Sequence, residues 1–201
     1  MMHLSILVTA LKGSEEVKPN RKPWQWLGVV FVLSFAALGF IGREIYLAAP
    51  PIASVVTSDG TSLYTSDEVQ TGQQVWLASG GQQLGTVWGH GSYVAPDWSA
   101  DWLHREAVAL RDLYAQQGFK QTYDALTTAD KAAVDATVKA EMRANTYDAK
   151  TNTVTVSRIR AKAIAEVARH YEGLFGDSAA LEKLREQYAM GDNLVTDAAD
   201  R

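Results

Sequence analysis

PWQWLGVVFVLSFAALGFIG, residues 23–42, is a run of twenty residues without a formal charge. A helix of that length spans about 30 Å, the thickness of the hydrocarbon core of a bilayer. Trp24 and Trp26 lie where an interfacial aromatic belt would place them, and Tyr46 can anchor the opposite end. The stretch predicts a transmembrane helix over residues 23–47, which divides the chain into a short tail and a larger domain.

The residues on either side of this helix predict its orientation. Lys18, Arg21 and Lys22 crowd the N-terminal flank, and the tail, residues 1–22, carries a net charge of +2. By the positive-inside rule the tail is cytoplasmic. Residues 48–201 then lie outside the cytoplasm, which is the periplasm if the helix spans a bacterial inner (cytoplasmic) membrane. Two alternatives are a cleaved signal peptide and the buried helix of a soluble protein. The apolar stretch of a signal peptide is usually shorter and ends at a better cleavage site.

The composition is that of a globular protein and excludes several functions. Apolar residues make up 47% of the chain and charged residues 21%. The net charge of −4 is not the excess of positive charge that is typical of nucleic-acid-binding proteins. The sequence contains no cysteine, which excludes disulfides, thiolate metal sites, a cysteine nucleophile and covalent c-type haem.

Turn and cap signals predict a mainly α outer domain with two minor β-hairpins. The hairpins cover residues 53–65, with Asp59-Gly60 at the turn, and residues 146–156, turning at 150–152. Ser66, Asp97, Thr128 and Ser157 are the expected starts of four helices that end near residues 79, 117, 144 and 172, and Gly118 is expected to close the second. A last helix is expected over residues 178–189.

Candidate chemistry is concentrated in residues 72–106, GQQVWLASGGQQLGTVWGHGSYVAPDWSADWLHRE. Four of the six tryptophans are here, and the simplest interpretation is a Trp-rich core or a flat docking surface. His90, His104 and Asp101 are residue types that bind transition metals, although a lone histidine is more often structural. His170 lies near the end of an expected helix, where a cation is favoured. No nucleophile, base and orienting group can be assembled, so the chain alone is not expected to be catalytic.

Three stretches of this region carry a family resemblance: residues 72–76 (GQQVW), 88–98 (WGHGSYVAPDW) and 100–106 (ADWLHRE). They resemble the N-terminal region of the quinol-dependent nitric oxide reductases, single-chain relatives of the haem–copper oxidases. The resemblance continues at residues 145–148 and 168–171 and runs from the anchor nearly to the last residue. It implies one transmembrane helix followed by a cytochrome-c-like extracytoplasmic domain, residues 48–201.

The resemblance also implies that a haem-attachment motif has been lost. The cytochrome c subunit of the cytochrome-dependent reductases carries Cys-x-x-Cys-His between comparable landmarks. Counted from Trp76, that motif falls on residues 81–85, which here read GQQLG. Covalent haem c cannot form, in agreement with quinol as the electron donor. Apolar side chains should then fill the haem volume, because a void would be destabilising; Leu77, Leu84 and Val87 are the candidates.

One metal role is implied by the same resemblance. In the cytochrome subunit, a Gly and a Tyr help to hold a calcium ion that bridges haem propionates of the catalytic subunit. The matching residues are Gly91, through its carbonyl, and Tyr93, and calcium accepts such oxygen ligands. The other ligands would come from the catalytic membrane domain, which also holds haem b and non-haem iron. That domain is not within these 201 residues, so the chain is expected to be a fragment or one subunit of a split enzyme.

The expected function is therefore the N-terminal module of a quinol-dependent nitric oxide reductase, an oxidoreductase that converts two NO to N2O and water in denitrification. This module would anchor and cap the catalytic domain, its partner. One alternative is a freestanding membrane-tethered interaction protein without a redox role. A second is an independent haem carrier that uses His90 or His104.

Overall fold

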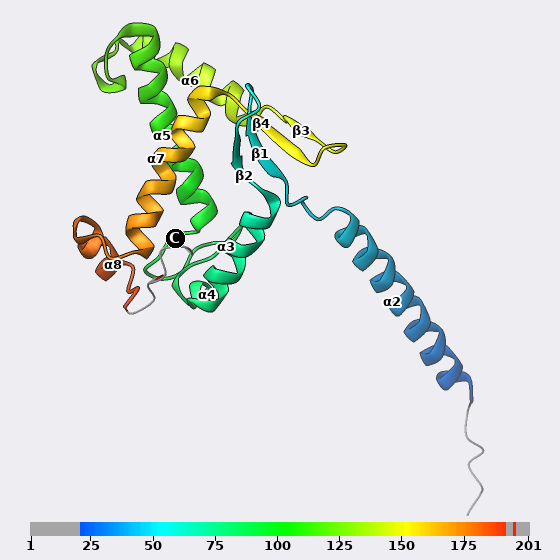
Figure 1. Cartoon of the computed structure of the whole chain (residues 1–201). Helices are drawn as coiled ribbons and strands as arrows, with labels where there is room; N and C mark the ends of the chain where they lie inside the picture. Colours follow the sequence, from blue (N-terminus) through cyan, green and yellow to red (C-terminus); the bar gives the residue numbers. More distant parts are fainter. Residues whose placement is uncertain (1–20, 192–194, 196–201) are drawn as a thin grey trace, which may run out of the picture. The chain divides into compact units, whose positions relative to one another are not determined.

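A computed structural model describes residues 21–191 and residue 195, and divides the chain into two compact units, residues 1–50 and 51–201 (Figure 1). The first unit contains the helix α2, Arg21–Leu47. Its 27 residues have a mean hydropathy of 1.9 over their most apolar window, so the helix is long and apolar enough to cross a membrane. It begins two residues before the predicted position, and Pro23 falls in its first turn, where a missing N–H costs nothing. Most of the predicted tail, residues 1–20, lies outside the described residues.

The second unit contains a four-stranded sheet with the order β2-β1-β4-β3. Its strands are β1 Ser54–Thr57, β2 Ser62–Tyr64, β3 Tyr147–Asp148 and β4 Thr153–Val156. Both predicted hairpins form, with Gly60 and Asn152 in the left-handed conformation at their turns. The structure adds a connection that the local turn signals do not contain. β1 pairs with β4 in parallel, from Ser54 opposite Thr153 to Thr57 opposite Val156, and merges the two hairpins.

The rest of this unit is mainly helical, as predicted. The α-helices are α3 Ser66–Ala78, α4 Gly81–Leu84, α5 Trp98–Phe119, α6 Thr128–Arg143, α7 Arg158–Phe175 and α8 Glu182–Gln187. Two 3-10 turns, η1 Tyr123–Ala125 and η2 Ala179–Leu181, connect neighbouring helices. The single helix predicted over residues 178–189 is thus a 3-10 turn followed by the shorter α8.

Short polar side chains begin the long helices. Asp97 and Ser157 cap α5 and α7 as predicted, each accepting a backbone N–H three residues ahead. The caps of α3 and α6 are Thr65 and Thr127, one residue before the predicted ones. For α3 the reason is Glu68: its carboxylate accepts the Thr65 N–H at 2.7 Å, which completes a capping box.

The C-terminal end of α5 differs from the prediction. Gly118 remains helical, and Lys120 takes the left-handed conformation that ends the helix, with a φ of 59°. The Lys120 N–H closes the last turn by donating to the Gln116 carbonyl at 3.2 Å. The residue predicted to close α5, Gly118, therefore lies two positions before the residue that closes it.

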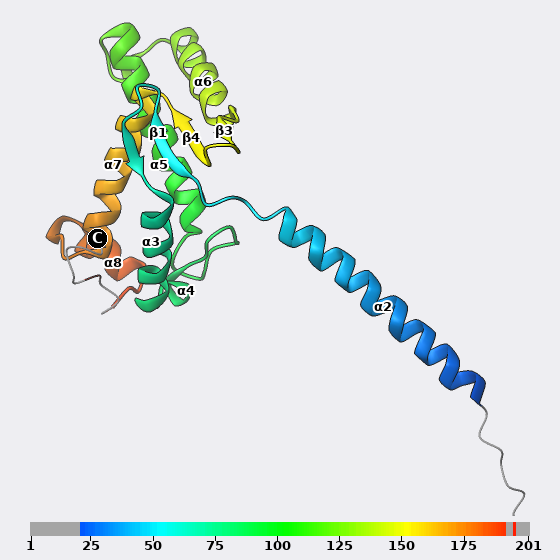
Figure 2. The same cartoon turned by 45° about the vertical axis from the view of Figure 1, so that its right-hand side comes forward.

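The core follows the antiparallel pair α5 and α7, which lie side by side in Figures 1 and 2. At one end α6 covers them, and buried Leu110, Val134, Val138 and Ala163 pack there. At the other end a second cluster surrounds Trp98, and is the one that concerns the site. Between the two clusters the carboxylate of Glu106, only 2% exposed, accepts a hydrogen bond from Arg160 at 2.6 Å.

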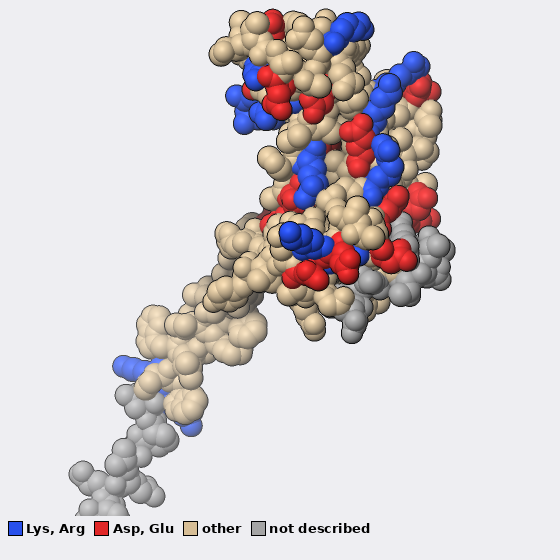
Figure 3. Space-filling view, turned by 90° about the vertical axis from the view of Figure 1, so that its left-hand side faces the viewer, with Lys and Arg blue, Asp and Glu red and all other residues tan. Residues whose placement is uncertain are grey.

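Charged side chains of both signs are mixed on one face of this unit. On the face drawn in Figure 3, Lys and Arg side chains alternate with Asp and Glu side chains. Such a face produces no extended potential of one sign.

Candidate functional site

The five residues that match the lost haem-attachment motif form α4 and the residue after it. A Cβ atom added to Gly81 would lie 2.2 Å from the indole nitrogen of Trp76. One added to Gly85 would lie 2.5 Å from the Pro96 carbonyl and 2.6 Å from the indole nitrogen of Trp98. Real Cβ contacts are essentially never under 3.0 Å. The backbone at both ends of this segment is therefore pressed against tryptophan rings, which leave no space for side chains there.

An aromatic cluster, which we define as Trp98, Trp102, Tyr171, Phe175 and Tyr188, packs beside this segment. The Trp98 ring contacts the edges or faces of Tyr171, Phe175 and Tyr188, with centroids 5.5 to 6.2 Å apart. Trp102 stacks on Tyr171 at 5.3 Å with an angle of 17° between the rings. Such pairs contribute beyond the area they bury. The cluster is the main filling of this part of the core.

Only one of the three predicted filling residues joins that core. Leu84 is 4% exposed and packs in the cluster around Trp98, as predicted. The predictions for Leu77 and Val87 are wrong, because their side chains are 46% and 50% exposed. Aromatic side chains of α5 and α7 pack against Leu84 in this part of the core instead. The prediction considered only residues close in sequence to positions 81–85, so it could not identify aromatic residues from distant helices.

A small polar network lies at the edge of the aromatic cluster. The carboxylate of Asp101 accepts hydrogen bonds from Arg105 and from the hydroxyl of Tyr171, both at 2.7 Å. Partial burial opposes ionisation of Asp101, but these two hydrogen bonds outweigh it and hold its pKa below the ordinary value. Burial and the bond to Asp101 raise the pKa of Tyr171. Asp101 thus acts as an acceptor that fixes the ring stacked on Trp102.

His170 lies next to this network, and its predicted role as a helix-end cation is wrong. α7 continues to Phe175, so His170 is not in the last turn. Partial burial and the charge of Arg105 lower the pKa of His170, which favours the neutral ring. Its Nε2 atom is buried, and among the described residues no group forms a hydrogen bond with it.

The loop of residues 86–97, which we call the Tyr93 loop, is held by Thr86 and Asp97. The Thr86 hydroxyl donates to the Asp97 carboxylate at 2.7 Å and accepts the Gly91 N–H at 2.8 Å. Asp97 also accepts the Gly89 N–H at 2.6 Å while it caps α5. The hydrogen bond from the Gly89 backbone N–H, and after it the one from the Thr86 hydroxyl, lower the pKa of Asp97. One ionised side chain thus fixes both the loop and the start of α5.

The calcium candidates Gly91 and Tyr93 both lie on this loop. Gly91 has a φ of +77°, and an added Cβ would lie 3.2 Å from the Ala95 carbonyl, so the position favours glycine. The Tyr93 side chain is fully exposed, and the neighbouring Trp88 is 82% exposed. Within residues 21–191 and 195, the structure gives no hydrogen-bond donor to the Gly91 carbonyl and no partner for the Tyr93 hydroxyl. The exposed Tyr93 hydroxyl and the Gly91 carbonyl thus have no hydrogen-bond partner among the described residues.

The other candidate ligands are not assembled into a site. His90, in the Tyr93 loop, and His104, on α5, are exposed, and Asp101 is occupied by Arg105 and Tyr171. Among the residues that the structure describes, no group of three His, Cys, Asp or Glu side chains could hold a metal ion. The transition-metal hypothesis for His90, His104 and Asp101 has no geometric support here.

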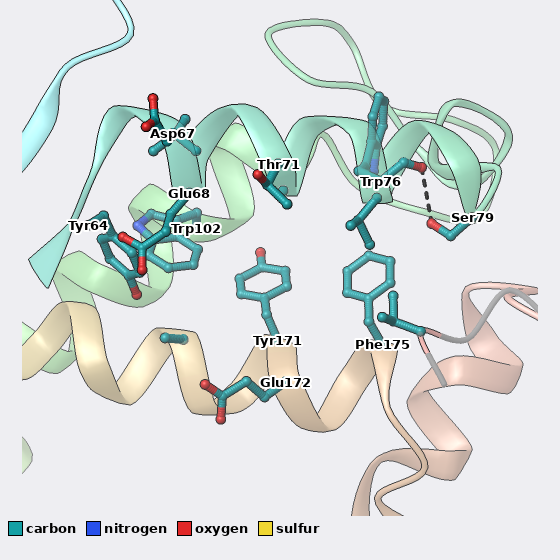
Figure 4. A pocket seen from close by; sticks show the side chains of 15 residues that line it. Tyr64, Asp67, Glu68, Thr71, Trp76, Ser79, Trp102, Tyr171, Glu172 and Phe175 are labelled. Carbon is teal, nitrogen blue, oxygen red and sulfur yellow. Dashed lines mark hydrogen bonds between the residues drawn. The ribbon is translucent and has the colours of Figure 1, made fainter. Parts of the chain in front are cut away.

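The structure also contains a cleft that the sequence did not predict. It lies between α3 and α7, has a volume of about 690 Å³, and is lined by residues of α3, α5 and α7 (Figure 4). Its walls include Tyr64, Trp102, Tyr171 and Glu172. Tyr64, Trp102 and Tyr171 are spread over about a hundred residues of sequence. The packing of α5 against α7 stacks Trp102 on Tyr171, and Tyr64 is the last residue of β2.

An apolar helix long enough to cross a membrane is followed by a mainly helical domain, which is consistent with a membrane-anchored protein. Residues 52–201 match the family of the NorB cytochrome c-like domain of nitric oxide reductase. The match covers most of the chain, so the chain belongs to this family. No curated protein sequence matches it.

Proposed function

We propose that this chain is the anchoring and capping module of a quinol-dependent nitric oxide reductase. In that reaction two NO, two protons and two electrons give N2O and water, and oxidation of one quinol to a quinone supplies the electrons and protons. The chemistry takes place in a catalytic membrane domain, in the same longer chain or in a separate subunit. The residues described here bind and position that domain.

The packing around α4 is the observation that carries this proposal. Trp76 and Trp98 occupy the space in which side chains at positions 81 and 85 would lie, and the sequence contains no cysteine. A module without haem c cannot pass electrons from a soluble cytochrome to the catalytic site. Since the chain belongs to a nitric oxide reductase family, the lack of haem c in this module supports a membrane quinol as the electron donor.

We assign the contact with the catalytic domain to the Tyr93 loop. Its backbone is fixed by Thr86 and Asp97, and its tip exposes Trp88, Tyr93 and Val94. A fixed loop with exposed aromatic side chains loses little conformational entropy on binding, which favours affinity. In the proposed complex the Gly91 carbonyl and the Tyr93 hydroxyl supply two oxygen ligands to a calcium ion. Such neutral oxygens suit calcium, and the other ligands come from the partner.

We further propose that α2 spans the inner membrane with its N-terminus in the cytoplasm, so that the domain of residues 51–201 is periplasmic. The absence of formal charge over residues 23–42 and the basic residues before them support this topology. A reporter enzyme that functions only outside the cytoplasm, fused after Arg201, should be active. Activity of a cytoplasmic reporter at the same position would overturn the orientation.

The proposal is tested by purifying the tagged chain from membranes of its native host. Haem b and quinol-dependent reduction of NO should accompany the wild-type chain. Trp88→Ala should reduce the amount of haem that is recovered, whereas Phe119→Ala, a change at an exposed aromatic residue at the end of α5, should not. A chain that carries no haem protein with it would favour the alternative, a freestanding membrane-tethered interaction protein.

The haem-carrier alternative predicts a different result. Reconstitution of the purified chain with haem would then give a Soret band that is lost in His90→Ala or His104→Ala. The residues that line the cleft include no histidine and no methionine, so axial ligation of a haem there has no support among the described residues. We expect no specific Soret band.

A further inference from the structure

The cleft between α3 and α7 takes no part in the function proposed above. We propose that it binds a small amphipathic organic cation, with an ammonium head group at the end near Tyr64 and an apolar tail at the end near Phe175. The inference does not depend on the reductase proposal.

The first support is that α3 leaves space beside α7. α3 contains no buried residue, although Val69, Val75 and Trp76 give it apolar side chains. The cleft beside it has a volume of about 690 Å³, which lies within the range of small-molecule sites. A helix that exposes apolar side chains toward an open cleft is stabilised when a ligand of similar shape covers them.

The second support is the negative charge at one end of the cleft. Glu68 of α3 lies beside Tyr64 and Trp102 at this end, and Glu172 lies on α7 below them in Figure 4. Burial first, and then the charges of Glu172 and Glu68, raise the pKa of the Tyr64 hydroxyl, so both carboxylates act on the same point. Asp67 lines the same region, but its side chain points away from the space between the helices in Figure 4.

No positive charge among the lining residues offsets these carboxylates. The lining includes no Lys, Arg or His within the described part of the chain. Arg105 lies near Tyr171, but its guanidinium is paired with Asp101 at 2.7 Å. The charged end of the cleft therefore attracts a cation and repels an anion.

The third support is the kind of surface beside these carboxylates. Trp102 and Tyr171 are stacked on each other and line the cleft, together with the ring of Tyr64. Tryptophan and tyrosine faces attract weakly hydrated organic cations, ammonium groups above all. Val75, Phe175 and Val195 line the other end, which suits an alkyl or aromatic tail.

These features favour an organic cation over a metal ion. Calcium and magnesium need six or more oxygen ligands that converge on one point. Here one carboxylate oxygen of Glu68 already accepts two hydrogen bonds from Thr65, at 2.7 and 2.8 Å. Glu172 belongs to the opposite wall, and the surfaces between the two are aromatic rings.

The test uses the full chain in micelles of a neutral detergent and three probes of similar size. Butyltrimethylammonium is the cation, 1-pentanol the neutral compound and valerate the anion, and ligand-observed NMR follows each titration against protein-free micelles. Butyltrimethylammonium should bind saturably and about tenfold more tightly than 1-pentanol, and valerate should not bind. Equal binding of the cation and the alcohol, or no saturable binding of the cation, would overturn the proposal.

A matched pair of variants on α7 locates the site. Glu172→Gln should weaken the binding of butyltrimethylammonium roughly three- to tenfold, the scale of one favourable ion or cation–π contact. Glu166→Gln makes the same chemical change at an exposed residue of the same helix that does not line the cleft, and should leave affinity unchanged. Equal affinities of the two variants would show that the cation binds elsewhere.

Discussion

One added methyl group at Gly85 should disturb the core beside the lost haem motif. The Cβ of Gly85→Ala would lie 2.5 Å from the Pro96 carbonyl, about 0.9 Å closer than the shortest ordinary contact of 3.4 Å. The atom in the way belongs to the backbone, and the Trp98 ring next to it is packed among three other aromatic rings. Overpacking of this kind costs about 1–3 kcal/mol. In a chain of this size it corresponds to a fall of roughly 2–12 °C in Tm.

The assay is thermal unfolding of the full chain, followed by near-ultraviolet circular dichroism, which reports the packing of the tryptophans. Gly118→Ala is the control, because an added Cβ there has nothing within 4 Å and the residue is helical. It should raise stability by about 0.4–1 kcal/mol. If Gly85→Ala melts at or above the wild-type temperature, the argument that Trp98 and Pro96 exclude a side chain at position 85 is refuted.

Three further predictions concern other parts of the domain. Glu106→Ala should destabilise the chain by about 3–5 kcal/mol, because it leaves Arg160 partly buried without its partner, and the double variant Glu106→Leu, Arg160→Met should recover most of the loss in urea unfolding. Since burial and Arg105 lower the pKa of His170, the unfolded state binds the proton first, and the free energy of unfolding should fall as the pH drops from about 7 to 5; His170→Gln should flatten this slope in urea titrations at several pH values. In the full-length reductase, Tyr93→Phe should lower the calcium content and alter the haem spectrum, whereas Tyr147→Phe should do neither; equal calcium in both would reduce Tyr93 to a packing residue.

Local signals in the sequence predicted the elements of the fold well. Asp97 and Ser157 are the caps that were expected, and Asp59-Gly60 is the expected turn. Such features depend on hydrogen bonds between residues two to four positions apart, so they can be found without a structure. The error at Thr65 is small, because Thr65 and Ser66 are neighbours with similar hydroxyl side chains that compete for the cap. The end of α5 was placed too early because glycine favours a helix end, whereas Gly118 remains helical here.

Features that depend on distant residues could not be predicted. The parallel pairing of β1 with β4 joins strands about a hundred residues apart in the sequence, and neither strand carries a signal for the other. For the same reason Leu77 and Val87 were expected in the core, whereas Tyr171 and Phe175, from a helix some ninety residues further on, take that place. The loop that contains Gly91 and Tyr93 was expected from its glycines, and the calcium role of these two residues stays a prediction. The clamp of this loop by Thr86 and Asp97 and the cleft beside α3 were not foreseen.

The pairing of β1 with β4 has a consequence for the order of events during synthesis. The side chain of Asn152 donates to the Ile52 carbonyl, 100 residues earlier in the chain, at the start of this pairing. At about 5–20 residues per second, the ribosome needs roughly 5–20 s to add the strand that covers β1. During that interval β1 has one unpaired edge, and such edges can join other chains. A nascent domain of this design should therefore depend on chaperones more than one whose sheet is made of consecutive strands.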